Sequence, residues 1–256
     1  MTEMLFTTMV APQINYPGGG QTVLMGLRLV HLVAGIVWVG LLYFFNLVNV
    51  PFQRELDAPT KLAIVPNLMP KALWWFRWSS VVTVLAGIAY WMHIVGTDVR
   101  NAIAGGDQVS GGGMMGGFFV IWTLAYVIEM GLLMSPADFL KKGPVLGVIM
   151  AIVMLAAAYV FLGMNQHGWE SNRALAIGIG GGLGWFMMLN VWGIIWRMQK
   201  KIIRWTEAAA KGAAMPAEAA KLARLAFLTS RINFWLSFPM LFFMGAASHY
   251  IMFAQR

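Results

Sequence analysis

Four residues that could do chemistry together lie at helical spacing inside one apolar stretch of the chain, residues 26–51. Arg28, His31, Gly35 and Trp38 fall at i, i+3, i+7 and i+10, which places their side chains on one face of a helix. Ionisable residues inside a membrane span are costly and mark functional sites. A guanidinium binds carboxylates, a neutral imidazole ligates iron, and a glycine leaves a gap, so this face could hold a flat cofactor.

The elements that position these residues must lie in a membrane. Of the 256 residues, 59% are hydrophobic and 11% are charged, and the mean hydropathy is +0.69, which argues against a soluble globular domain. The chain has no cysteine, which excludes disulfides, thiolate-ligated clusters and covalent attachment of a c-type haem. The net charge of +8 fits the basic cytoplasmic loops of membrane proteins, so we expect a lipid bilayer as partner and no nucleic acid.

Six stretches of the sequence are long and apolar enough to cross a bilayer. We predict an all-α polytopic membrane helix bundle, a single transmembrane domain over residues 1–256, with six transmembrane helices plus interfacial helices. The expected spans are about 22–50, 72–95, 118–140, 144–163, 174–198 and 225–252. Residues 52–71 mix charges with prolines, which is typical of a surface-lying helix and turns, and the basic, alanine-rich segment 199–224 predicts a helix near the headgroups.

The basic residues are distributed unevenly between the two sides of this bundle. If the N-terminus is outside, 14 of the 18 Lys and Arg fall on the inner side, and the outer side holds four: Arg28, Arg100, Arg173 and Arg256. Because cytoplasmic loops collect Lys and Arg, we predict an N-out/C-out protein of the bacterial cytoplasmic (inner) membrane, with both termini periplasmic.

With this orientation the four histidines lie toward the outer face: His31, His93, His167 and His249. Two histidines from facing helices can give a six-coordinate b-type haem centre suited to electron transfer, and four histidines would permit two such centres. Arg28, one turn outward of His31, is placed to pair with a haem propionate. The alternative for each histidine is a hydrogen bond to a backbone carbonyl, and this is what we expect for His167.

Small residues accompany some of these histidines. One helical turn deeper than His31 and His249 stand Gly35 and Gly245, and a small residue beside an axial ligand leaves room for a macrocycle. Glu129 is the carboxylate that we expect near mid-depth of the third span, where burial favours its uncharged form. We interpret Glu129 as a proton carrier, with a hydrogen-bonded structural carboxyl as the alternative, and we assign no other catalytic residue.

Several blocks of the sequence resemble a known family. HLVAGIVWVGLLYFFNLVNVP, ALWWFRW, LNVWGIIWRMQKK and SRINFWLSFPMLFFMGAASHY are similar to the N-terminal membrane domain of the bacterial cytochrome-c-linked urate oxidases (urate hydroxylases). In that family a cytochrome c domain follows, which implies a periplasmic C-terminus. Because the sequence ends at Arg256 without a cysteine, we expect no such domain here and a separate cytochrome c that receives the electrons. The family-like blocks carry His31 and His249, which are therefore our first choice as axial ligands, with His93 as substitute.

Three functions stay open. The first is an integral-membrane b-type haem protein that mediates electron transfer at the periplasmic face, to or from a cytochrome c or a partner respiratory complex. The second is the membrane subunit of a cytochrome-c-coupled urate or purine oxidase, for which the candidate substrate-binding residues are Arg28, Asn46, Asn49 and Arg231. The third is a cofactor-free structural subunit of a membrane complex.

Overall fold

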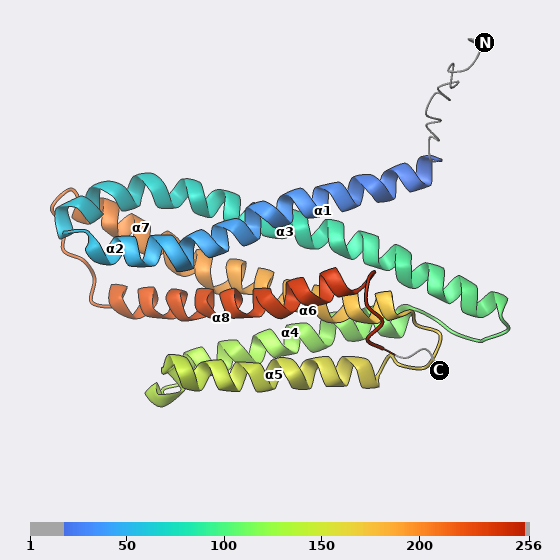
Figure 1. Cartoon of the computed structure of the whole chain (residues 1–256). Coiled ribbons are helices and arrows are strands. Elements are labelled where there is room, and N and C mark those ends of the chain that lie inside the picture. The colour runs from blue at the N-terminus through green and yellow to red at the C-terminus, as the bar shows by residue number, and fades with distance from the viewer. Residues whose placement is uncertain (1–17, 254–256) are drawn as a thin grey trace, which may run out of the picture.

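Long apolar runs fold as helices because a helix satisfies every backbone N–H and C=O within itself, as the interior of a bilayer demands. The computed structural model describes residues 18–253, and all regular structure within them is helical (Figure 1). Six helical rods in this part of the chain are long and apolar enough to cross a membrane: Gly19–Glu55, Ala58–Ala104, Gly112–Met134, Gly143–Gly163, Asn172–Ala209 and Ala219–Ala246. The predicted all-α membrane fold with six spans is confirmed.

The first two rods run side by side for much of their length (Figure 1). The first consists of α1 (Gly19–Tyr43), a π-helical segment (Phe44–Asn49) and α2 (Val50–Glu55), and the second is the single helix α3 (Ala58–Ala104).

Over residues 52–71 we expected a surface-lying helix and turns, and the structure has the end of α2, a short turn and then the start of α3, which continues into the second rod. Asp57 caps α3, because its carboxylate accepts a hydrogen bond from the N–H of Thr60 at 3.0 Å. The helix then continues through Pro66 and Pro70. Each proline removes one backbone hydrogen bond, yet α3, which packs on α1 and α7, runs through both without a break.

The other four rods form the second half of the bundle. They comprise α4 (Gly112–Met134), α5 (Gly143–Gly163), α6 (Asn172–Asn190), which continues through a π-helical segment (Val191–Ile195) into α7 (Trp196–Ala209), and α8 (Ala219–Ala246). Helix α6 lies at the centre and packs on α3, α4, α5 and α8. Its glycines allow this close approach: the ring of Trp122 on α4 occupies the place where Gly182 would carry a side chain.

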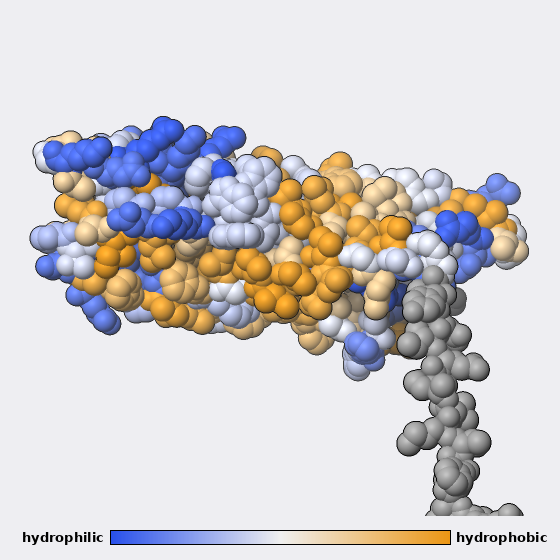
Figure 2. Space-filling view, turned by 90° about the horizontal axis from the view of Figure 1, so that it is seen from above, coloured by the Kyte–Doolittle hydropathy of each residue, from blue (hydrophilic) through white to orange (hydrophobic). Residues whose placement is uncertain are grey.

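The two ends of the bundle differ in charge. Helices α1, α4 and α6 begin at one end of the bundle, and α3, α5 and α8 end there. We call this the N-terminal end, and we call the opposite end the basic end. Figure 2 shows an apolar band around the middle, and hydrophilic residues are densest on the left, where Figure 1 places α2 and α7. Basic residues of this end include Arg54, Lys61, Lys141, Lys142, Lys200, Lys201 and Arg204. The chain termini, whose placement we predicted as periplasmic, lie outside the described residues.

Candidate functional site

The face of α1 that carries the predicted residues is turned toward α3. The guanidinium carbon of Arg28 lies 4.7 Å from the ring centroid of Tyr90, and Nδ1 of His31 lies 2.8 Å from the carbonyl oxygen of Thr83. A β-carbon of a larger residue at Gly35 would lie 3.6 Å from Cγ2 of Thr83. The gap left by Gly35 therefore faces Thr83 on α3.

The hydrogen bond of His31 fixes its tautomer. Because a carbonyl oxygen only accepts, Nδ1 carries the hydrogen and donates it to Thr83, which leaves Nε2 with a free lone pair. Metal-ligating histidines commonly have their other ring nitrogen bonded in this way. Further along the same face, Trp38 is buried, and its indole N–H has no hydrogen-bond partner.

A second arginine reaches Tyr90 from the other half of the bundle. The guanidinium carbon of Arg173, on α6, lies 5.3 Å from the centroid of the Tyr90 ring, and its Nη2 donates a hydrogen bond to the tyrosine hydroxyl. The Nε of Arg173 is buried without a partner. Within residues 18–253 neither Arg28 nor Arg173 forms an ion pair. The sequence indicated a role for Arg28 and none for Tyr90 or Arg173. The pattern within one helix does not show which residues of other helices that helix contacts.

The C-terminal segment folds back over the start of α6. Helix α8 ends at Ala246 rather than near residue 252, and Oδ1 of Asn172 accepts hydrogen bonds from the N–H groups of Met252 at 2.9 Å and Phe253 at 3.0 Å. His249 lies in this turn with an exposed side chain. It therefore comes from a turn above α6 and not from a helix facing α1.

The other residues predicted to accompany the histidines lie apart. Gly245 is exposed and has no neighbouring atom where a β-carbon would stand. His93 is exposed on α3, one turn beyond Tyr90. No hydrogen bond joins His31 to His249 or to His93, so the pairing of these histidines stays a prediction.

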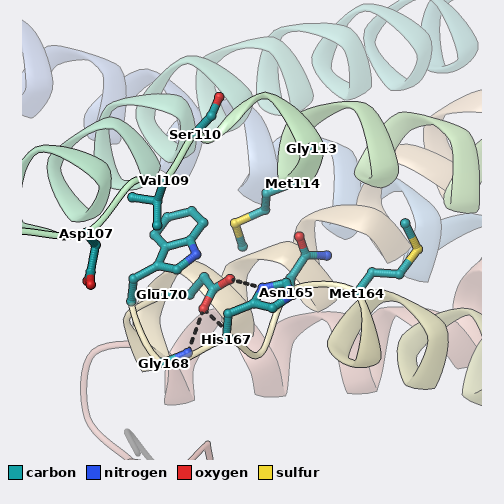
Figure 3. A pocket seen from close by; sticks show the side chains of 11 residues that line it. Asp107, Val109, Ser110, Gly113, Met114, Met164, Asn165, His167, Gly168 and Glu170 are labelled. Atoms are coloured by element: carbon teal, nitrogen blue, oxygen red, sulfur yellow. Dashed lines mark hydrogen bonds and ion pairs between the residues drawn. The ribbon is translucent and has the colours of Figure 1, made fainter. Parts of the chain in front are cut away.

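A cavity of about 620 Å³ opens where the loop between α3 and α4 meets the loop between α5 and α6 (Figure 3). Glu170 is 3% exposed, and its carboxylate accepts hydrogen bonds from the N–H groups of His167 at 2.9 Å and Gly168 at 3.2 Å. The same carboxylate lies 2.9 Å from Nδ1 of His167. Asn165 and Met114 line the cavity nearby.

This histidine–carboxylate pair can act as a base. A carboxylate that accepts the Nδ1 hydrogen orients the imidazole and leaves Nε2 of His167 free to take a proton. We expected the imidazole of His167 to hydrogen-bond a backbone carbonyl, but its Nδ1 bonds the carboxylate of the buried Glu170 instead. The H-x-x-E spacing in HGWE is the signal in the sequence that would have identified the pair.

Glu129 lies far from these groups, close to the end of α4 at Met134 and thus nearer the basic end than mid-depth. It is fully buried, both carboxyl oxygens lack a hydrogen-bond partner, and Asn190 lies beside it. Asn190 donates to Oδ1 of Asn233 at 2.9 Å, and Asn233 donates to the carbonyl of Met187 at 2.9 Å. A polar cluster therefore joins α4, α6 and α8, and the role of Glu129 as a proton carrier stays a prediction.

The asparagines considered for substrate binding are used in helix packing. Asn46 donates to the carbonyl of Leu42 at 2.9 Å and to Oγ of Ser230 at 3.0 Å, and Asn49 is buried. Asn46 stands 18 residues after Arg28, about 27 Å along the helix. The structure therefore does not bring these residues together with Arg28, and Arg231 lies over the ring of Phe227 on its own helix.

Among residues 18–253, no three His, Asp or Glu side chains converge as ligands for a metal ion. A haem held by two histidines is a different kind of site, because it needs no such cluster of three.

Residues 56–256 match the family described as urate oxidase N-terminal. Comparison with curated proteins and with solved structures gives no match. The matched region begins just after α2, so it includes the cavity with His167 and Glu170, as well as Tyr90 and Arg173, whereas Arg28 and His31 precede it.

Proposed function

This chain belongs to the urate oxidase N-terminal family, and from that premise we propose that it is the membrane subunit of a system that oxidises urate or a related purine. The electrons pass to a cytochrome c. The observation that carries the proposal is the family match over residues 56–256, and the cavity between the two loops gives the chemistry a place inside that region.

Oxidation of a purine needs a base and polar groups that bind the purine. Hydroxylation of a purine carbon by water adds one oxygen atom and releases two protons and two electrons. His167, oriented by Glu170, can take up a proton at Nε2. The amide nitrogen of Asn165 donates to the carbonyl of Phe161 at 2.7 Å, which leaves its Oδ1 to accept a hydrogen bond from a purine N–H.

Reduction of a cytochrome c by urate tests this function. The protein in lipid nanodiscs should reduce added ferricytochrome c only when urate is present. Because a positioned general base contributes about 10²–10⁴-fold to rate, His167→Gln and Glu170→Gln should lower the rate by at least about 10²-fold. Asp138→Asn, an exposed acidic residue at the basic end, is the matched control and should keep the full rate. A stable wild-type protein that neither binds urate nor reduces the cytochrome would favour the structural-subunit interpretation instead.

A second candidate function, electron transfer through a b-type haem, is favoured by one observation. His31 donates from Nδ1 to Thr83 and so presents Nε2 as a free ligand. His31 would hold the iron together with His249 or His93, and Arg28 would pair with a propionate. Such a group would carry single electrons toward the cytochrome. A reducible b-type spectrum in the purified wild type that is lost in His31→Ala would support this function, and a colourless wild type would contradict it.

We further propose that the N-terminal end of the bundle faces the periplasm of a bacterial inner membrane. The support is the concentration of Lys and Arg at the opposite end. Since the chain has no cysteine, single cysteines report the orientation directly. In intact spheroplasts, a membrane-impermeant maleimide should label Ser110→Cys, in the loop between α3 and α4, and should not label Lys211→Cys. The reverse labelling pattern would invert the orientation.

A further inference from the structure

Tyr90 is contacted by two arginines that come from different halves of the bundle. Arg28 on α1 and Arg173 on α6 both place their guanidinium carbons within 5.3 Å of its ring centroid. Cation–π contact with a tyrosine ring stabilises each guanidinium, and the hydrogen bond from Arg173 to the hydroxyl fixes the second one. Two positive charges are thus held against one aromatic ring.

In the part of the chain that the structure describes, no carboxylate forms an ion pair with either arginine. Asp98, on the same helix as Tyr90, is engaged elsewhere, because it accepts hydrogen bonds from the N–H of Ser171 at 3.0 Å and from its hydroxyl at 2.7 Å. Like charges that contact the same ring near a low-dielectric region repel each other, and an anion that pairs with both lowers this repulsion.

A hollow lies beside the second arginine. Its volume is about 480 Å³, and it is lined by Ser171, Asn172, Arg173, Ala247, Ser248 and Ile251. The buried Nε of Arg173 has no hydrogen-bond partner among residues 18–253. An anion in this hollow would meet the side chain of Arg173, and the hydroxyl of Ser248 is a further donor.

The opposite flank of the pair is apolar. On α1, the residues around Arg28 expose large hydrophobic side chains, among them Met25, Leu29 and Leu32. Acyl chains can cover such a surface while a phosphate stays at the level of the arginines. A lipid headgroup and a soluble anion can thus reach the same two guanidiniums.

We propose that Arg28, Tyr90 and Arg173 form a binding site for an oxyanion, in which a phosphate or carboxylate group is bridged by the two guanidiniums. Guanidinium forks match the paired oxygens of these groups. The oxyanion comes either from the headgroup of an anionic lipid or from a soluble organic anion. The inference goes beyond the proposed function, because binding of the anion needs no redox chemistry and stands even if urate is not oxidised.

The test compares anion binding in two lipid environments. Native mass spectrometry counts the phosphatidylglycerol molecules that the protein retains from mixed nanodiscs, and thermal-shift titrations in pure phosphatidylcholine nanodiscs use inorganic phosphate or urate as the soluble probe. The variants are Arg28→Gln and Arg173→Gln. Arg100→Gln is the matched control, since Arg100 is an exposed arginine at the same end whose Nη2 bonds Oγ1 of Thr97 at 2.8 Å.

In the wild type we expect saturable binding in at least one arm. Loss of one charge-assisted hydrogen-bonding fork should weaken that binding by about tenfold or more in Arg28→Gln and in Arg173→Gln, and Arg100→Gln should match the wild type. Retention of phosphatidylglycerol alone would identify a lipid, and a response to phosphate or urate alone would identify a soluble anion. Absence of saturable binding in both arms, or an equal loss in Arg100→Gln, would overturn the proposal. Arg28 is exposed, so its variant tests the site even if Arg173→Gln does not fold.

Discussion

The imidazole of His31 on α1 rests against α3 where a glycine, Gly87, leaves room for it. A β-carbon at Gly87 would lie 2.8 Å from Nδ1 and Cε1 of the ring, which is closer than these atoms can approach. The glycine therefore permits the hydrogen bond between His31 and the carbonyl of Thr83, and with it the packing of α1 on α3.

Gly87→Ala should displace the His31 ring from the carbonyl of Thr83. We expect a destabilisation of about 1–3 kcal/mol, the usual range for overpacking a tight contact, because α1 makes most of its helix contacts with α3. The measurement is thermal unfolding of the purified protein in detergent, followed by circular dichroism.

Gly40→Ala is the control for the change at Gly87. Gly40 is also a helical glycine of the α1–α3 pair, but no atom lies within 4 Å of where its β-carbon would stand. Alanine favours a helix over glycine by roughly 0.5–1 kcal/mol, so this variant should be as stable as the wild type or slightly more stable. Equal stability of the Gly87 and Gly40 variants would contradict the tight contact at His31.

Gly182→Ala should disrupt the packing of α4 on α6. The ring of Trp122 occupies the position of the new methyl group, whereas at the neighbouring Gly181 the nearest atoms would stand at an ordinary 3.7 Å. Because Trp122 is fully buried and has no free space to move into, we expect a loss of at least about 2 kcal/mol. Gly181→Ala should leave the unfolding temperature nearly unchanged, and a similar loss in both variants would show that the contact with Trp122 does not decide the effect.

The six spans could be predicted because hydropathy and length are local properties of the sequence. The extension of α3 back to Ala58 could not, since Pro66 and Pro70 break helices by local rules, yet α3, which packs on α1 and α7, runs through both. Likewise, the apolar pattern continues to residue 252, but Asn172 binds the backbone of the last described residues in a turn.

The residues of the site that lie on one helix could be predicted from the sequence, whereas the contacts between residues of different helices could not. The helical period placed Arg28, His31 and Gly35 on one face, and the structure turns that face toward α3. Their partners Tyr90 and Arg173 depend on how three helices are aligned along their axes. That alignment is set by packing, such as the indole of Trp91 donating to the carbonyl of Ala174 at 2.8 Å, and no single helix reveals it.

Asn233→Ala should weaken the junction between α6 and α8. Asn233 donates to the carbonyl of Met187 and accepts from Asn190, both at 2.9 Å. Hydrogen bonds between membrane helices contribute about 0.6 kcal/mol on average and up to about 1.7 kcal/mol, so the loss of two should cost about 1–3 kcal/mol in unfolding free energy. Asn67→Ala is the control, because exposed Asn67 bonds only the carbonyl of Ala63 within its own helix. Equal stability of Asn233→Ala and Asn67→Ala would show that the junction between α6 and α8 does not depend on this pair.

The capping aspartate at the start of α3 should respond to pH. Hydrogen bonds from the side chain and the backbone N–H of Thr60 hold the pKa of Asp57 below its ordinary value, which is about 4. A carboxyl whose pKa is lower in the folded state stabilises the fold when it is ionised. The helix start is therefore fully capped above pH of about 4 and loses its cap as the pH falls through the lowered pKa.

The amide resonance of Thr60 reports this titration by NMR, since that N–H donates to Oδ1 of Asp57 at 3.0 Å. Its chemical shift should change with a midpoint below the ordinary aspartate value. Asp57→Asn is the matched variant: an asparagine caps a helix about as well as an aspartate but does not titrate, so its Thr60 resonance should stay constant over the same range. A midpoint at or above the ordinary value in the wild type, or an unchanged titration in Asp57→Asn, would show that another carboxyl controls the start of α3.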